Sequence, residues 1–150
     1  MKITRLSFKE LNEKIKQYNL EFSKKDILEV KQENDVRVIF INQQPMFFYH
    51  QEKVVPTLHY LQHHSLLKKI TIDMGAVKFI VNGADVMRPG IVEIEDTINK
   101  DEFIVKIDNN HKKPLAVGIA LYNSEEMQSL KTGKVIKNIH YVGDEIWKIS

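Results

Sequence analysis

Residues 73–91 read DMGAVKFIVNGADVMRPGI, and this stretch decides the fold of the chain. Ala76 to Val81 has the length of a short helix, Gly83-Ala84 closes it, and Pro89-Gly90 forms a turn directly before an apolar segment. Glycines at both turns leave the backbone uncovered, so a ligand can approach it closely. The stretch therefore predicts a short helix followed by an exposed loop that a ligand can approach.

Composition limits the class of protein. The 150 residues suffice for one domain or two small ones, and 43% hydrophobic with 28% charged residues is ordinary for a globular chain. The absence of cysteine excludes disulfides, thiolate nucleophiles and cysteine-based zinc sites. No apolar run approaches the ~20 residues that span a bilayer. Because polar residues from Lys9 onward interrupt any signal peptide, we expect a cytoplasmic protein with no membrane partner.

The net charge of +2 is too small to indicate a nucleic-acid ligand by itself. Residues 1–70 hold 12 Lys and Arg against 8 Asp and Glu, whereas residues 71–150 hold 10 against 12. Basicity thus lies mainly outside the segment quoted above. A contact with RNA there requires a few well-placed cations rather than a strongly basic surface.

The N-terminal half predicts a helix beside a small antiparallel sheet. Ser7 and Glu10 have the spacing of a capping box, so a helix should begin after Ser7. A second helix should begin at Thr57 and end near Lys68-Lys69, which places the domain boundary at residue 70. Three strands are expected between these helices, at residues 27–32, 36–41 and 46–49.

The C-terminal half predicts a small barrel. Strand-like segments are Val86 and residues 91–94, 103–108, 115–122, 135–140 and 146–149. Within residues 115–122, large residues alternate with Ala116, Gly118 and Ala120, and we expect the large ones to fill the barrel. Trp147 is also expected in the barrel core. Ser124 should begin a helix, with Gly133 as its stop.

With the elements placed, the sequence resembles the PUA domain, named for pseudouridine synthases and archaeosine transglycosylases. The matching segments, in order, are residues 73–76, 82–91, 115–118, 133–135, 140–141 and 144–147. Pro45-Met46-Phe47-Phe48 and Val55-Pro56-Thr57-Leu58 look like the pre-PUA domain of the malignant-T-cell-amplified-sequence family. The resemblance implies an α+β chain. An N-terminal pre-PUA domain of helix and antiparallel sheet (residues 1–70) precedes a mostly β PUA pseudo-barrel (residues 71–150).

This resemblance implies a noncatalytic RNA-binding protein that acts in translation initiation, reinitiation or recycling. The expected partners are rRNA of the small ribosomal subunit, the acceptor end of tRNA, or both. Because the eukaryotic family works with density-regulated protein, an initiation-factor-like protein is a further possible partner. Two alternatives stay open, namely a protein-interaction adaptor and an RNA-targeting accessory subunit of an RNA-modification system.

The residues expected to contact RNA lie in the quoted stretch and at the end of a later strand. Lys78 and Arg88 can reach phosphate, and Tyr141 or His140 can stack on a base. Solvated charge is the alternative for the two cations, and tight packing is the alternative for the glycines and Tyr141. The full expected set is Gly75, Lys78, Asn82, Gly83, Ala84, Arg88, Pro89, Gly90, His140 and Tyr141.

No pattern predicts catalysis, a cofactor or a metal. His59 and His63 have the spacing that puts two imidazoles on one helix face, but the general-base Glu of metalloproteases and a third ligand are missing. The acidic residues Glu93, Glu95, Asp96, Asp101 and Glu102 lack the spacing of a calcium loop and are expected to be solvated. There is no phosphate-binding loop, catalytic triad order or dinucleotide fingerprint.

Overall fold

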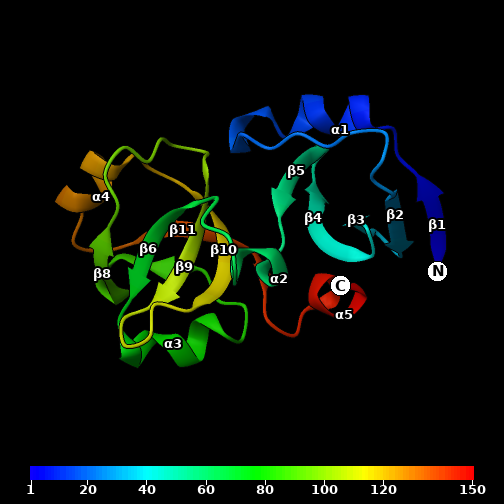
Figure 1. Ribbon diagram of the computed structural model, residues 1–150. Coiled ribbons are helices and arrows are strands. Elements are labelled where there is room, and N and C mark those ends of the chain that lie inside the picture. Colours follow the sequence, from blue (N-terminus) through cyan, green and yellow to red (C-terminus); the bar gives the residue numbers. More distant parts are fainter. The chain divides into compact units, whose positions relative to one another are not determined.

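The computed structural model describes residues 1–150, which form two compact units (Figure 1). Unit 1 comprises Met1–Leu66 together with Gly143–Ser150, and unit 2 comprises Leu67–Val142. This division differs from the expected one at both ends of the second domain. The last eight residues belong with the N-terminal unit, and the boundary between the units precedes Leu67.

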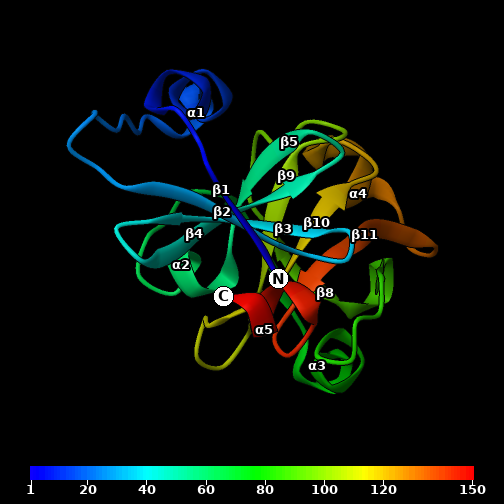
Figure 2. The same cartoon turned by 90° about the vertical axis from the view of Figure 1, so that its right-hand side faces the viewer.

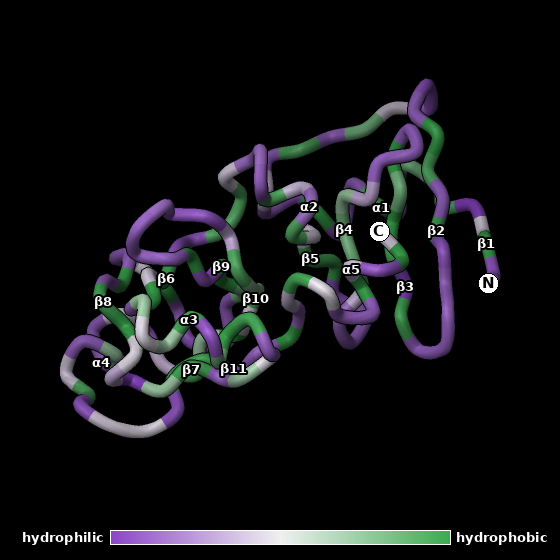
Figure 3. Tube along the Cα trace, turned by 90° about the horizontal axis from the view of Figure 1, so that it is seen from below, coloured by the Kyte–Doolittle hydropathy of each residue, from purple (hydrophilic) through white to green (hydrophobic).

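Unit 1 contains an antiparallel sheet with the strand order β1-β2-β3-β4-β5. Its strands are β1 (Lys2–Arg5), β2 (Leu28–Glu33), β3 (Val36–Ile41), β4 (Gln44–His50) and β5 (Lys53–Pro56). The three expected strands are confirmed as β2, β3 and β4. The hydrophilic connection between β2 and β3, at residues 34–35, is coloured purple in Figure 3.

Helices cover this sheet on two sides. They are α1 (Phe8–Lys14), the 3-10 helix η1 (Lys16–Tyr18), α2 (Leu58–Leu61) and α5 (Glu145–Ile149). Ser7 caps α1 as expected, because its hydroxyl accepts the Glu10 N–H at 3.1 Å. Since α1 and α5 lie on opposite sides of the sheet (Figures 1 and 2), residues 38–41 of β3 are all buried.

Three expectations for the residues of unit 1 are wrong. Residues 146–149 form part of helix α5 rather than a strand, because the Asp144 carboxylate accepts the Trp147 N–H at 2.8 Å and caps the helix. Trp147 therefore lies in unit 1, where its ring stacks on His59 at 3.6 Å between centroids. The second helix begins after Thr57 as expected but ends at Leu61, so His63 does not share a helix face with His59.

Unit 2 contains a six-stranded sheet with the order β7-β11-β10-β9-β6-β8. Val86 of edge strand β7 and Ile94 of edge strand β8 join the same buried cluster, so the sheet curls around one core. This confirms the α+β class with a C-terminal pseudo-barrel. Its strands are β6 (Lys68–Ile72), β7 (Val86–Met87), β8 (Ile91–Ile94), β9 (Phe103–Asp108), β10 (Pro114–Ala120) and β11 (Lys134–Tyr141).

Three helical elements accompany the barrel: α3 (Met74–Ile80), the 3-10 helix η2 (Arg88–Gly90) and α4 (Ser124–Ser129). Helices α3 and α4 lie at opposite ends of the unit in both views (Figures 1 and 2). Asn123, rather than Ser124, caps α4 and forms a complete capping box with Glu126. A membrane-spanning helix would need a longer apolar stretch than any helix of this structure provides.

The orientation of β10 is the reverse of the one expected. Ala116 and Ala120 belong to the core cluster, whereas the fully buried Val117 does not. Small side chains therefore face the interior of the barrel. The space that they leave is filled by residues of neighbouring strands, including Ile136 and Lys106, both of which lie close to Gly118.

Candidate nucleic-acid interface

Helix α3 and the loop that follows it are held by short-range hydrogen bonds. The Asp73 carboxylate caps the helix by accepting the Gly75 N–H at 3.0 Å. At the other end, the Asn82 side chain donates to the Lys78 carbonyl at 2.9 Å. The backbone of Gly83, with a φ of +92°, then turns the chain away from the helix. Gly75 and Asn82 thus shape the two ends of the helix.

Gly83 lies directly against the ring of Tyr141. A Cβ atom at residue 83 would come within 2.8 Å of the Tyr141 ring, a distance that real Cβ atoms do not show. The loop after α3 and the end of β11 are therefore neighbours, although Gly83 and Tyr141 are 58 positions apart in sequence. Tyr141 also packs against the core cluster and is only partly exposed. The ring of Tyr141 borders the loop, and Ala84 within that loop is half-buried.

The Pro89-Gly90 turn is packed against α3. A Cβ atom at residue 90 would lie 3.1 Å from that of Ala76, and the Gly90 carbonyl accepts the Asp73 N–H at 2.9 Å. Gly90 therefore allows the turn to pack closely on α3, which is the alternative to RNA contact that was given for the glycines. Pro89 is exposed beside it.

The two expected cations differ in their surroundings. The Arg88 guanidinium donates through Nε to the Met127 carbonyl at 2.7 Å and through Nη1 to the Ile91 carbonyl at 3.4 Å. Arg88 thereby ties the turn to α4, so its replacement would disturb packing as well as charge. Lys78 is exposed on α3, with its amino group 5.1 Å from the ring centroid of the exposed Phe79.

One expected residue is not accessible. His140 is fully buried, so its side chain cannot contact RNA at this surface. The strand alternation accounts for the difference, because His140 and Tyr141 are consecutive residues of β11 and point to opposite faces. We therefore remove His140 from the set of contact residues and keep Tyr141.

Two cations that the sequence did not single out lie on β11. Lys134 pairs in register with Met87 of β7, and its amino group is 3.5 Å from the Asp85 carboxylate. Lys137 is exposed on the same strand. The strand that ends at Tyr141 was expected to carry contact residues, so its other lysines were the signal that could have identified these two.

Charge is unevenly distributed over unit 2. With the observed boundaries, the unit holds 11 Lys and Arg against 10 Asp and Glu, a balance of +1. Seven of the ten acidic residues lie in residues 93–102 and 125–126, on β8, the loop after it and α4. Because α3 and α4 lie at opposite ends of the unit, most of these carboxylates are remote from α3. The surface formed by α3, its loop and β11, called here the α3–β11 face, therefore suits phosphate better than the α4 end.

A buried lysine lies beneath this face. Lys106 of β9 is fully buried, and its amino group donates to the Asn138 side-chain oxygen at 3.0 Å. Burial lowers the pKa of Lys106 from 10.5 to about 7, and the nearby Asp85 carboxylate partly opposes that shift. Nothing in the sequence distinguishes this lysine from the exposed ones, because its burial depends on the tertiary fold.

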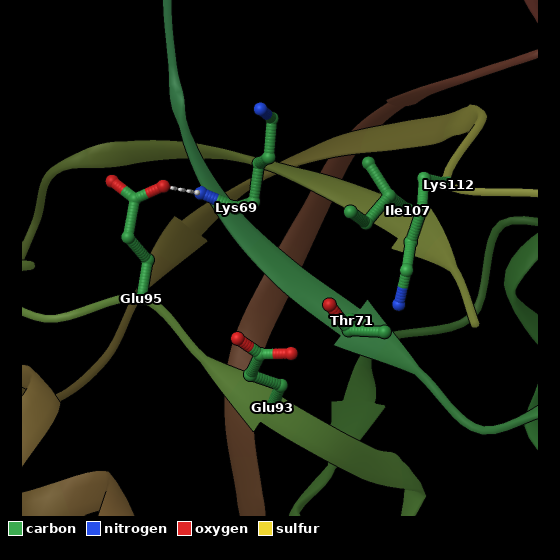
Figure 4. Close-up of a pocket in the computed structure, with 6 residues that line it drawn as sticks. All are labelled: Lys69, Thr71, Glu93, Glu95, Ile107 and Lys112. Carbon is green, nitrogen blue, oxygen red and sulfur yellow. Dashed lines mark hydrogen bonds between the residues drawn. The ribbon is translucent and has the colours of Figure 1, made fainter.

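A pocket of about 280 Å³ lies elsewhere in unit 2, on the outer surface of β6 and β8. Glu93 and Lys112 extend toward Thr71 from opposite sides, and the Lys69 N–H donates to Glu95 at 3.4 Å (Figure 4). The two carboxylates disfavour phosphate, and none of the expected contact residues lines the pocket. It is distinct from the α3–β11 face.

Comparison with family models matches both units. Residues 68–142 match the PUA domain, and residues 7–64 match a domain of unknown function, DUF1947. A solved hypothetical protein from Pyrococcus horikoshii superposes with a TM-score of 0.87 at 31% identity, covering 99% of each chain. A conserved PUA-domain protein from Thermoplasma acidophilum gives a TM-score of 0.80 at 28% identity, again over 99% of each chain.

Relatives with similar sequences cover most of the chain. An uncharacterised protein of Methanocaldococcus jannaschii is 46% identical over 83% of this chain and 77% of the relative. Translation machinery-associated protein 20 of Schizosaccharomyces pombe is 30% identical, over 83% of this chain and 72% of its own length. A malignant T-cell-amplified sequence 1 homolog of Dictyostelium discoideum is 28% identical, over 81% and 70%.

Proposed function

This chain belongs to the PUA-domain family, in the group that includes translation machinery-associated protein 20 and the malignant T-cell-amplified sequence proteins, and we propose that it is a noncatalytic RNA-binding protein of translation. The RNA contact is assigned to the α3–β11 face of unit 2. The proposed RNA is rRNA of the small ribosomal subunit, the acceptor end of tRNA, or both. Unit 1 would then contact the ribosome or an initiation-factor-like protein.

One observation carries this proposal: the loop at Gly83 lies against the ring of Tyr141, and the neighbouring elements α3 and β11 present the exposed lysines Lys78 and Lys137. Proteins recognise RNA through phosphates, 2′-hydroxyls and unstacked bases, so an interface needs donors and flat apolar surface together. The α3–β11 face offers both. Its donors are Lys78 and Lys137, and its apolar surface includes Phe79 and Met87, which are 57% and 52% exposed.

The proposal also explains why a chain of low net charge can bind RNA. Each phosphate neutralised by a lysine releases condensed counterions, so a few local contacts yield a salt-dependent affinity. The acidic residues are concentrated on β8, its following loop and α4, so they need not oppose contacts at α3. Because Arg88 donates to the Met127 carbonyl of α4, the phosphate contacts of this face are assigned to the exposed lysines.

The acidic end of unit 2 supports a second function, that of a protein-interaction adaptor. Seven carboxylates on β8, its following loop and α4 form a surface that suits a basic protein partner and disfavours RNA. On this alternative, the chain would form a stable protein complex and bind no RNA at low salt.

Crosslinking in cells, followed by sequencing of the bound RNA, tests the two functions together. We expect small-subunit rRNA or tRNA to be recovered with the wild-type chain. Recovery should fall several-fold for the double variant Lys78→Ala, Lys137→Ala, because each lysine contributes a phosphate contact. Lys100→Ala, in the acidic segment, is the matched control and should leave recovery unchanged. No enrichment of any RNA with the wild-type chain, alongside a stable protein complex, would favour the adaptor.

A further inference from the structure

The α3–β11 face is supported from below by a chain of polar contacts that begins in the core of the barrel. We propose that Lys106 is a positioning residue for RNA binding, which holds the segment Gly83–Asp85 in place through Asn138 and Asp85. This inference rests on the proposed function, since it concerns the same face. Lys106 itself, being fully buried, touches no ligand.

The path of the Lys106 side chain depends on Gly118. Lys106 lies on β9 and its partner Asn138 lies on β11, so the side chain must pass the intervening strand β10. At Gly118 of β10, a Cβ atom would lie 3.0 Å from Cε of Lys106 and 2.5 Å from Cγ2 of Ile136. The missing side chain of Gly118 therefore opens the passage through which Lys106 reaches β11.

Hydrogen bonds continue the path from Asn138 to the surface. The Lys106 amino group donates to Asn138 Oδ1 at 3.0 Å, and the Asn138 backbone N–H donates to Asp85 Oδ1 at 2.7 Å. Asp85 directly follows Gly83-Ala84, the segment that lies against Tyr141. Two hydrogen bonds thus connect the buried amine to the exposed loop.

The energetic cost of burying Lys106 argues for a role beyond packing. A methionine of similar length would fill the same space without desolvating an amine, and buried polar groups are often replaceable by apolar ones at no loss of stability. The charged groups nearest the amine are Asp85 and, beyond it, the exposed Lys134. Only Asp85 favours the charged form. The amine therefore lowers stability while it fixes Asn138 and, through it, the loop.

A positioning role and a purely structural role for Lys106 predict different effects of its replacement on stability and on RNA affinity. Lys106→Met should leave the thermal unfolding midpoint unchanged or raise it. It should also weaken RNA binding about tenfold, the size of effect expected for residues that couple through a contact network. A residue needed only for packing would lower the unfolding midpoint and the affinity together.

The experiment compares the full-length wild type with Lys106→Met, Asn138→Ala and Ile104→Met. Ile104 lies on the same strand in the same core, and its apolar side chain can form no hydrogen bond with the three polar groups, so it controls for repacking. Affinities are measured for bulk tRNA and for purified small ribosomal subunits. Unfolding midpoints and the ¹H–¹⁵N amide shifts of Ala84 and Asp85 are measured on the same preparations.

We expect Lys106→Met and Asn138→Ala to shift both amides and weaken binding, with Ile104→Met unchanged in both. Unshifted amides and wild-type affinity in the two network variants would overturn the proposal. Equal losses in the network variants and in Ile104→Met would overturn it as well. If Lys106→Met does not fold, Asn138→Ala alone decides. If wild type binds neither probe, the proposed function fails, and the amide shifts still decide whether Lys106 positions the loop.

Discussion

At the scale of single residues, the contact between Gly83 and Tyr141 defines the candidate interface. Two physical reasons require glycine at residue 83: a φ of +92° and a ring within 2.8 Å of any added Cβ atom. The family resemblance predicted contact residues both in the loop and at the end of β11, and the structure shows that these two segments are neighbours. The sequence alone could not show which reason applies, because a positive φ and close packing both require a glycine at this position.

Gly83→Ala should therefore destabilise unit 2 by about 1–3 kcal/mol, the sum of backbone strain and the displaced Tyr141 ring. Gly133→Ala is a matched control, since Gly133 has a φ of +90° and no atom within 4 Å of its added Cβ. Urea unfolding of both variants isolates the contribution of Tyr141. Equal destabilisation by the two substitutions would show that the ring makes no tight contact with the loop.

The buried Lys106 predicts how the stability of unit 2 depends on pH. Its pKa is about 7 in the folded chain and 10.5 as the reference for the unfolded chain. Between these values the unfolded chain binds more protons, so the free energy of unfolding rises with pH from about 7 to about 10. Lys106→Met should remove this rise. Urea midpoints of the wild type and of Lys106→Met at pH 7.5 and 9.5 measure this rise. An equal pH response in the two proteins would contradict the lowered pKa of the buried Lys106.

At the scale of elements, strands with alternating or continuous apolar residues were predictable, and short ones were not. Strand β1 has four exposed residues and β5 has only four residues, so neither carries a hydrophobic pattern of its own. Both form by adding to strands that are already paired. The β10 strand was predicted in position but not in orientation, because a strand buried on both faces gives no polar side to mark the outside.

The C-terminal segment was misread because two signals competed. Ile146 and Ile149 are β-branched and suggested a strand, whereas Asp144 and Glu145 form the N-terminal signal of a helix. The cap prevailed, because α5 can pack on the sheet of unit 1 and stack Trp147 on His59. The packing of α5 in unit 1 therefore outweighs the strand propensity of Ile146 and Ile149.

This assignment predicts which unit depends on Trp147. Trp147→Ala should destabilise unit 1 by about 1–3 kcal/mol, less than for a fully buried tryptophan because the side chain is only partly buried. Amide hydrogen exchange should accelerate in β3, which contacts α5, and remain unchanged in β9 and β10. Faster exchange confined to β9 and β10 would instead place Trp147 in the barrel core, as the sequence first suggested.

At the scale of the whole molecule, unit 1 is formed by two separate segments, Met1–Leu66 and Gly143–Ser150, with unit 2 between them in the sequence. Family resemblance predicted both folds. It could not predict that the last eight residues belong to unit 1, because that depends on their tertiary contacts. The same is true of the site. Motif residues located the loop, Lys78 and Tyr141, whereas the exposure of Lys137 and the burial of Lys106 and His140 depend on strand register and barrel packing.

The central claim is that RNA binds the α3–β11 face of unit 2. Ultraviolet crosslinking of the full chain to purified small ribosomal subunits and to bulk tRNA, followed by mass spectrometry of the crosslinked peptides, tests it most directly. We predict crosslinks within residues 74–90 and 134–141, with Phe79 and Tyr141 among the crosslinked residues. Crosslinks confined to residues 93–102 and 125–126, or to unit 1, would contradict the account.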